Sequence, residues 1–251
     1  MNILRTIVCF GYMFGYMLLH LPVLYRGKKA LAAGDMDTVQ AITDKHIPHW
    51  SRTLLRLAGA QITVEGRENI PQTGACVFVA NHRSYTDILV ALSCLDAPHG
   101  LLAKQEIDRL PLIRQWMRLL GCVFVVREDV KASMRALNDA TATVAAGRSF
   151  TIFPEGTRYK GAEGGMGECK GGAFRIAAKC GAPLVPVVMT GTRRLFEDNG
   201  NRFGPSQVVV HILPAIPTAG LSRAEQKALP ERTHDILAGE LARMTGQEPA
   251  E

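Results

Sequence analysis

Short apolar runs alternate along most of the chain with stretches whose apolar residues recur every three or four positions. The runs are typical of buried strands and the periodic stretches of helices. Strands are expected at residues 62–64, 76–80, 100–103, 122–126, 150–153, 184–189 and 208–213. Helices are expected from about 86 to near 98, at 111–120, 134–144 and 172–179, and in a polar C-terminal segment with a break at Pro230. This alternation predicts an α/β fold, with a mostly parallel sheet flanked by helices on both faces.

The N-terminal residues follow a different pattern. Residues 6–25 contain no Lys, Arg, Asp or Glu and are long enough to cross a bilayer. Arg5 precedes them and three basic residues follow within 26–29, which predicts that the rest of the chain lies on the cytoplasmic side. A cleaved signal peptide is the alternative, although its charges would be distributed the other way round. The segment either spans the membrane or is tilted and half inserted, because it is interrupted by Gly11, Gly15, His20 and Pro22.

Residues 37–58 are expected to form an amphipathic helix that ends at Gly59. One face is apolar, and the other carries Lys45, Arg52 and Arg56 among its basic residues. Such a helix either lies on the membrane surface or packs on the domain with its basic face in solvent. We therefore divide the chain into an N-terminal membrane-associated helical segment, 1–59, and an α/β domain, 60–251.

Composition narrows the possible partners. The formal net charge is +6, which suits a nucleic acid, an anionic membrane surface or a phosphorylated substrate. Aromatic residues make up only 6% and do not alternate with basic residues, so a nucleic-acid partner is disfavoured. The six cysteines form no CxxC pair, which favours free thiols in a reducing compartment over a disulfide framework.

The polar residues with chemical potential cluster where three predicted strands end. His82 and Asp87 follow the first of these strands, Arg127 follows the second, and residues 154–158 follow the third. In an open α/β sheet, ligands bind beyond the carboxyl ends of the strands. We therefore expect these residues to meet at one edge of the sheet.

His82 and Asp87 are the candidate acid–base pair. They cannot pair inside a regular helix, because five steps of about 100° place them on different faces. They can meet if His82 lies in the turn and Asp87 in the first helical turn. The pair would then be a base oriented by a carboxylate, with no serine nucleophile needed. The alternative is a helix-entry turn capped by Ser84 or Asn81, in which His82 is merely packed.

The other two strand ends suggest an anion site. Arg127 and Arg158 could form a fork for a phosphate. Gly156 would let the backbone approach the anion, and Thr157 could add a hydroxyl donor. Glu155 could hold an arginine in position or accept a hydrogen bond from a substrate hydroxyl. Each arginine alone would also be consistent with a surface charge or a structural ion pair.

The order and spacing of these motifs resemble those of the membrane glycerophospholipid acyltransferases, most closely the 1-acyl-sn-glycerol-3-phosphate (lysophosphatidic acid) acyltransferases. The resemblance covers residues 61–213. Lys104 also resembles a lysine that family members place near the phosphate, and Tyr159 stands where the family usually has serine. The four matching blocks are Asn81, His82 and Asp87 in Asn-His-x4-Asp; Gly121 to Arg127; Phe153 to Arg158 in Phe-Pro-Glu-Gly-Thr-Arg; and Val185 to Val188.

The resemblance implies a mechanism. His82, assisted by Asp87, would take the proton from the free hydroxyl of the acceptor. The alkoxide would attack an acyl thioester of coenzyme A or acyl carrier protein, without a covalent acyl-enzyme. Lys104, Arg127 and residues 155–158 would bind the acceptor and its phosphate. Neither a metal nor a cofactor other than this acyl donor is implied.

The expected reaction acylates the sn-2 hydroxyl of 1-acyl-glycerol 3-phosphate and gives phosphatidic acid for phospholipid biosynthesis. The expected partners are the membrane lipid and the acyl donor, with no nucleic acid. The catalytic domain is expected to face the cytoplasm at the inner membrane. Another lysolipid such as a lyso-aminolipid, or glycerol 3-phosphate, is an alternative acceptor. A non-catalytic lipid-binding relative is a further alternative, although the intact His82–Asp87 pair argues against it.

Overall fold

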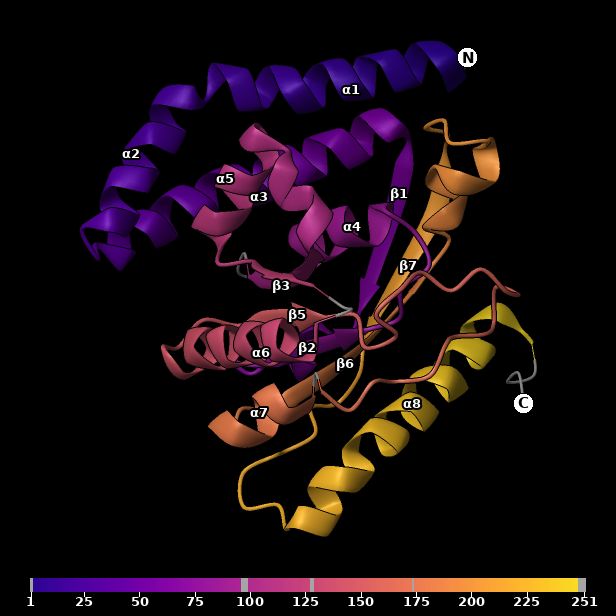
Figure 1. The fold of residues 1–251 in the computed structure, drawn as a ribbon. Coiled ribbons are helices and arrows are strands. Elements are labelled where there is room, and N and C mark those ends of the chain that lie inside the picture. Colours follow the sequence, from indigo (N-terminus) through magenta and orange to yellow (C-terminus); the bar gives the residue numbers. More distant parts are fainter. Residues whose placement is uncertain (1, 96–98, 127–128, 173, 248–251) are drawn as a thin grey trace.

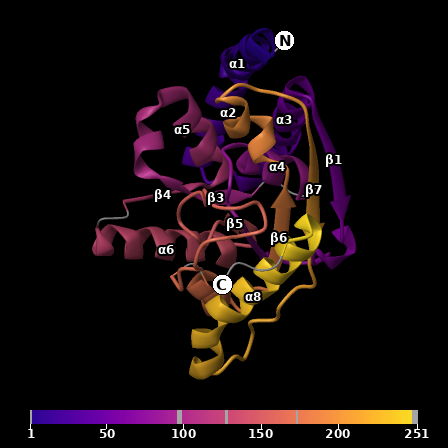
Figure 2. The same cartoon turned by 90° about the vertical axis from the view of Figure 1, so that its right-hand side faces the viewer.

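A computed structural model of the chain describes residues 2–95, 99–126, 129–172 and 174–247. Its centre is a seven-stranded sheet in the order β1-β7-β6-β2-β5-β3-β4, with β1 and β7 at one edge and β4 at the other (Figures 1 and 2). All neighbouring strands are parallel except β6 and β7, so the predicted mostly parallel sheet is confirmed. The strands are β1 (Ala60–Glu65), β2 (Val77–Ala80), β3 (Gly100–Lys104), β4 (Val123–Val125), β5 (Phe150–Ile152), β6 (Leu184–Thr190) and β7 (Ser206–Ile212).

Helices cover both faces of this sheet (Figure 1). They are α1 (Asn2–Leu19), α2 (Leu21–Ala32), α3 (Met36–Ala58), α4 (Thr86–Cys94), α5 (Pro111–Leu120), α6 (Val130–Ala145), α7 (Phe174–Cys180) and α8 (Arg223–Thr245). Short 3-10 turns lie at η1 (Arg67–Asn69), η2 (Gln105–Arg109), η3 (Arg193–Leu195) and η4 (Glu197–Asn199).

The pleat of β2 contributes to two of the apolar cores, one on each face of the sheet. Phe78 and Ala80 pack with buried residues of α3 and α4 on one face. Val77 and Val79 pack with buried residues of α6, α7 and α8 on the other. Successive residues of a strand point to opposite faces, so a strand covered on both sides is apolar throughout. This explains why β2 appears in the sequence as an uninterrupted apolar run.

The N-terminal apolar segment forms two helices rather than one. α1 ends at Leu19 and α2 begins at Leu21, with Pro22 in the first turn of α2, where its missing N–H costs little. α1 is long and apolar enough to cross a membrane, with a mean hydropathy of 1.4, yet only 11% of it is buried. Cys9 and Met17 face the domain, while Ile7 and Leu18 are exposed. An apolar face of this kind is typical of a membrane-associated helix.

α3 packs against α4, with Leu54 and Leu55 buried in the same core as β2. Its polar face remains outside, and the guanidinium Nε of Arg52 donates to the Ser93 carbonyl at 3.0 Å. The residues before 60 therefore share a core with the sheet, as the packed-helix interpretation of residues 37–58 requires. The division of the chain at residue 59 stays a prediction.

The predicted break at Pro230 is wrong, because α8 runs through it. A proline inside a helix removes one backbone hydrogen bond and strains the preceding turn. Here Leu229, Leu237 and Leu241 are buried against the sheet, and a capping box of Ser222 and Glu225 starts the helix. Tertiary packing and a strong N-terminus therefore outweigh the local cost of the proline.

Candidate active site

The turn between β2 and α4 brings His82 and Asp87 together. The Nδ1 atom of His82 lies 2.9 Å from Oδ2 of Asp87, which sits in the first turn of α4. The same oxygen accepts hydrogen bonds from the backbone N–H groups of Arg83 and Ser84, both at 2.7 Å. Asp87 is 1% exposed, so these donors fix a carboxylate that has little contact with water. The pairing expected from a turn followed by a helix is the one that the structure shows.

The histidine ring is oriented for proton transfer. Its side chain is 15% exposed and stacks on Phe153, with ring centroids 4.2 Å apart. In the tautomer that donates Nδ1–H to Asp87, the lone pair lies on Nε2. Nε2 can therefore accept a proton from a group outside the turn, while Asp87 stabilises the resulting imidazolium.

Glu155 binds the backbone of this histidine and that of the loop after the 154–158 turn. Its Oε1 accepts from the backbone N–H of His82 at 2.6 Å, and its Oε2 accepts from that of Gly167 at 3.0 Å. Burial raises the pKa of the Glu155 carboxyl, and the two backbone hydrogen bonds oppose this effect. The sequence suggested an arginine or a substrate hydroxyl as its partner. The structure instead assigns both oxygens to backbone amides, and Arg158 pairs elsewhere.

Arg158 lies beside the histidine turn. One guanidinium nitrogen, Nη1, is 3.0 Å from Oε1 of Glu197, and the guanidinium carbon lies 3.6 Å from the centre of the Tyr85 ring. Its side chain is 28% exposed, so part of the group remains accessible. Arg127, the second arm of the predicted phosphate fork, lies outside the described residues.

The remaining predicted binding residues lie around the same edge of the sheet. Gly156 has a φ of +70°, a conformation that favours glycine, and a Cβ there would lie 3.1 Å from Nζ of Lys170. Thr157 is exposed, and Lys104 is exposed at the end of β3. Lys170 was not anticipated from the sequence. Its ammonium group adds positive charge directly beside the 154–158 turn.

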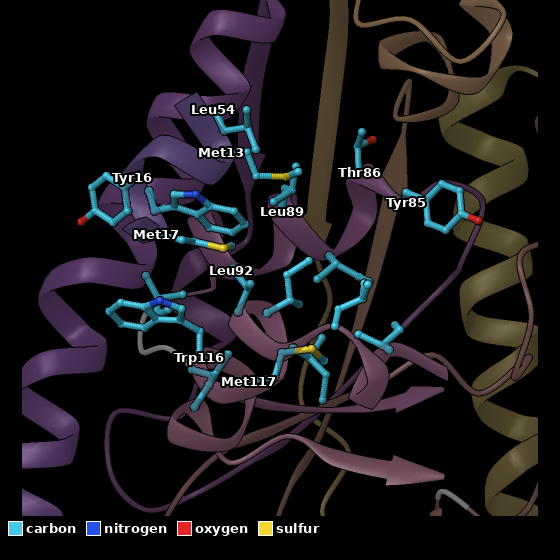
Figure 3. A pocket seen from close by; sticks show the side chains of 18 of the residues that line it. Met13, Tyr16, Met17, Leu54, Tyr85, Thr86, Leu89, Leu92, Trp116 and Met117 are labelled. Carbon is cyan, nitrogen blue, oxygen red and sulfur yellow. The ribbon is translucent and has the colours of Figure 1, made fainter. Parts of the chain in front are cut away.

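An apolar cavity of about 470 Å³ opens next to the histidine turn. Figure 3 shows Tyr85 and Thr86 on one side of it and Tyr16, Met17 and Trp116 on the opposite side. Helices α1, α3, α4 and α5 all contribute to the lining. Within the described part of the chain, no group of three or more His, Cys, Asp or Glu side chains is arranged to hold a metal ion.

Known proteins share both the motifs and the fold. Residues 61–190 match the family model described as Acyltransferase. The chain belongs to the acyltransferase family. The 1-acyl-sn-glycerol-3-phosphate acyltransferase of Borreliella burgdorferi is 32% identical over 187 residues, which are 74% of each chain. The human 1-acyl-sn-glycerol-3-phosphate acyltransferase alpha is 30% identical over 183 residues, 72% of this chain and 64% of the human protein.

A solved structure extends the likeness to almost the whole acyltransferase. The crystal structure of the 1-acyl-sn-glycerophosphate (LPA) acyltransferase PlsC from Thermotoga maritima aligns with a TM-score of 0.77 and 25% sequence identity. The alignment covers 98% of this chain and 99% of that one. It therefore includes the N-terminal helices as well as the sheet and its motifs.

Arg83 is a part of this acyltransferase site that sequence reasoning missed. It is 5% exposed, and its guanidinium donates to the carbonyls of Gly161, Glu163 and Gly165 at 2.9, 3.1 and 3.0 Å, and to that of Ala162. These bonds hold the glycine-rich loop that follows the 154–158 turn against the histidine turn. Nothing local in the sequence indicates these partners, because they are carbonyl groups far along the chain.

Proposed function

We propose that this acyltransferase moves a fatty acyl group from an acyl thioester to the sn-2 hydroxyl of 1-acyl-sn-glycerol 3-phosphate and releases phosphatidic acid. The observation that carries the proposal is the His82–Asp87 pair at the edge of an apolar cavity, with Arg158 beside it. A base, a hydrocarbon site and a cation for phosphate are what this acceptor and its acyl donor require. The names of the relatives support the same reaction.

The catalytic step is a direct acyl transfer. Nε2 of His82 takes the proton of the acceptor hydroxyl as its oxygen bonds to the thioester carbonyl carbon. The tetrahedral intermediate then breaks its carbon–sulfur bond and expels the thiolate, which receives the proton from the imidazolium. Asp87 stabilises the imidazolium between these two events. A thiolate is a good leaving group, so no covalent acyl-enzyme is needed.

Positive groups around the turn bind the acceptor phosphate. Arg158 offers further N–H donors besides the one that meets Glu197. Lys104 and Lys170 add charge at the same edge, and Arg127 is assigned to it from its sequence position. Since the glycerol backbone links the phosphate to the sn-2 hydroxyl, binding the phosphate sets the hydroxyl near His82.

The apolar cavity suits an acyl chain. Its lining is mostly aliphatic, thioether and aromatic side chains, which favour a hydrocarbon over any charged group. The donor is acyl-coenzyme A or acyl carrier protein, and no other cofactor takes part. The exposed apolar face of α1 supports association of the enzyme with the membrane that contains the acceptor, and the basic flank at 26–29 supports the cytoplasmic face of the inner membrane.

The test uses detergent-purified protein, acyl-coenzyme A or acyl carrier protein as donor, and separate acceptors: lysophosphatidic acid, a lyso-aminolipid and glycerol 3-phosphate. Product mass should show phosphatidic acid as the main product with either or both donors. Preferential acylation of another acceptor, or no transfer from either donor, would contradict the proposal. His82→Ala serves as the inactive control.

A further inference from the structure

Glu197 connects two parts of the site that are far apart in sequence. It begins η4, after β6, and its side chain is 12% exposed. Its Oε1 accepts from the backbone N–H of Tyr85 at 2.9 Å and pairs with Nη1 of Arg158 at 3.0 Å. Its Oε2 accepts from the Ser84 hydroxyl at 2.6 Å. One carboxylate therefore links the histidine turn to the 154–158 turn.

The guanidinium of Arg158 has one contact at its edge, with Glu197, and one on its planar face, with Tyr85. Glu197 fixes one nitrogen of the guanidinium, and the Tyr85 ring lies beneath its plane. Among the hydrogen bonds of the described residues, Glu197 is the one side-chain partner of this guanidinium. Its remaining N–H groups are therefore oriented by these two contacts and are available to an anion.

The reaction requires a fixed distance between Arg158 and His82, because the phosphate and the reacting hydroxyl belong to one glycerol unit. A free arginine side chain would sample many rotamers and would place the phosphate less accurately. The Glu197 contacts to Ser84 and Tyr85 attach Arg158 to the same turn that carries His82. Any shift of that turn therefore moves His82 and the guanidinium of Arg158 together.

We infer that Glu197 is a positioning residue, which aims Arg158 at the acceptor phosphate and keeps it in register with His82. This role deepens the proposed function and rests on it. Glu197 contacts neither reacting atom and acts through Arg158. Its negative charge also opposes phosphate binding, so the sign of its effect distinguishes positioning from simple charge.

The first experiment compares Glu197→Gln with the wild type in acceptor kinetics. Glutamine has nearly the same shape but only one accepting oxygen and no charge, so it cannot satisfy all three donors. The KM for lysophosphatidic acid should rise about tenfold with the KM for the acyl donor unchanged. A lower acceptor KM would show that the charge of Glu197 only weakens the positive electrostatic potential at the phosphate site. That result would overturn the inference.

Asp198→Asn is the matched control. Asp198 is the next residue, and it pairs with Arg193 at 2.9 Å. This variant removes the same charge from the same turn without touching Arg158, so acceptor kinetics should stay close to wild type. An equal rise in KM for Asp198→Asn and Glu197→Gln would assign the effect to net charge, and would contradict positioning.

A double-mutant cycle with Arg158→Ala separates positioning from a structural role. Arg158→Ala alone should raise the acceptor KM roughly tenfold to a hundredfold with kcat little changed, as expected for a phosphate contact. If Glu197 acts through Arg158, adding Glu197→Gln to Arg158→Ala should raise KM no further. Additive effects would mean that Glu197 supports the turn independently, and would overturn the inference even if both variants fold.

The outcomes for the function and for Glu197 are distinguishable. A wild type that acylates only phosphate-free acceptors contradicts both. A wild type that shows no transfer contradicts the proposed function, while the same cycle measured on equilibrium binding of lysophosphatidic acid still tests Glu197. If the wild type is active but the effects of Glu197→Gln and Arg158→Ala are additive, the result contradicts the inference about Glu197 and leaves the proposed function standing.

Discussion

Several contacts besides the one with Asp87 hold His82 in position. Its ring rests on Phe153, its Nδ1 meets Asp87, its backbone N–H is bound by Glu155, and its carbonyl accepts from Tyr159 N–H at 2.7 Å. A base held at so many points keeps one orientation, so its side chain loses little conformational entropy when substrate binds.

Replacing His82 by alanine should remove the base without disturbing this surrounding structure. We expect kcat to fall roughly 10²- to 10⁴-fold, the usual contribution of a positioned general base. The thermal unfolding temperature in detergent should stay close to that of the wild type, because the side chain contributes only the stacking on Phe153 and the bond to Asp87, while the backbone hydrogen bonds of His82 to Glu155 and Tyr159 remain. Wild-type turnover in folded His82→Ala would contradict the mechanism.

The Glu155→Gln variant tests whether Glu155 holds two backbone N–H groups or binds substrate. Glutamine keeps one accepting oxygen and turns an NH₂ group toward the other backbone N–H, so one buried amide loses its partner. This should lower the free energy of unfolding by about 1–3 kcal/mol and reduce kcat as the histidine turn loosens.

The measurements are denaturant unfolding and acceptor kinetics on the same preparation. Glu168→Gln provides the control, because Glu168 is exposed in the same loop. Unchanged stability with a raised acceptor KM in Glu155→Gln would show that Glu155 binds substrate instead.

The sequence carried enough information to place His82 with Asp87, because both lie in one short turn whose geometry follows from the helix that begins at Thr86. It could not place Arg83 or Glu197 in the site. The hydrogen bonds of these two residues reach partners far along the chain, and such pairings arise only when the whole fold assembles. Motif positions are therefore recoverable from local pattern, whereas the contacts that hold the motifs together are not.

At the scale of helices and strands, the apolar runs located the strands but not their neighbours. β1 lies beside β7, and β2 lies between β5 and β6. The strands buried on both faces, such as β2, β5 and β6, are all largely apolar, so their composition cannot specify which strand pairs with which. The break expected at Pro230 failed for a related reason, since a local propensity was outweighed by burial of Leu237 and Leu241.

Helices α1, α3, α4 and α5 jointly form the apolar cavity that we propose for the acyl chain, and Trp116 of α5 lies on the side opposite Tyr85 (Figure 3). Trp116→Leu should enlarge this end. We expect kcat/KM for longer acyl donors to rise about tenfold relative to shorter ones, which is the size of effect that extra methylene groups have in an apolar pocket.

The measurement is a competition among acyl donors of increasing chain length, analysed by product mass. Leu119→Val is the matched control, because Leu119 is buried in the same helix and does not line the cavity. An unchanged chain-length profile in folded Trp116→Leu would remove Trp116 from the boundary of the acyl site.

At the scale of the whole molecule, α1 has two apolar faces in different environments. Phe10, Met13 and Met17 line the acyl cavity, whereas Leu4, Ile7 and Leu18 are 68%, 63% and 56% exposed. The first face packs on the domain, and we propose that the second contacts the membrane. A helix fixed to the domain along its length is better suited to lie at the membrane surface than to leave the domain and cross the bilayer.

Replacing Leu4, Ile7 and Leu18 together by glutamine should therefore weaken membrane binding without unfolding the enzyme. Each exposed side chain contributes roughly 1 kcal/mol when buried in lipid, so binding to anionic vesicles in a flotation assay should fall at least about tenfold. Activity toward a short-chain, water-soluble lysophosphatidic acid should persist, because the cavity face is intact.

Met134→Gln is the control. It replaces an exposed apolar residue on α6 and should leave flotation unchanged. If the triple variant floats like the wild type, the exposed face of α1 is not the membrane contact. If it instead loses its fold, that face packs against the protein rather than against lipid.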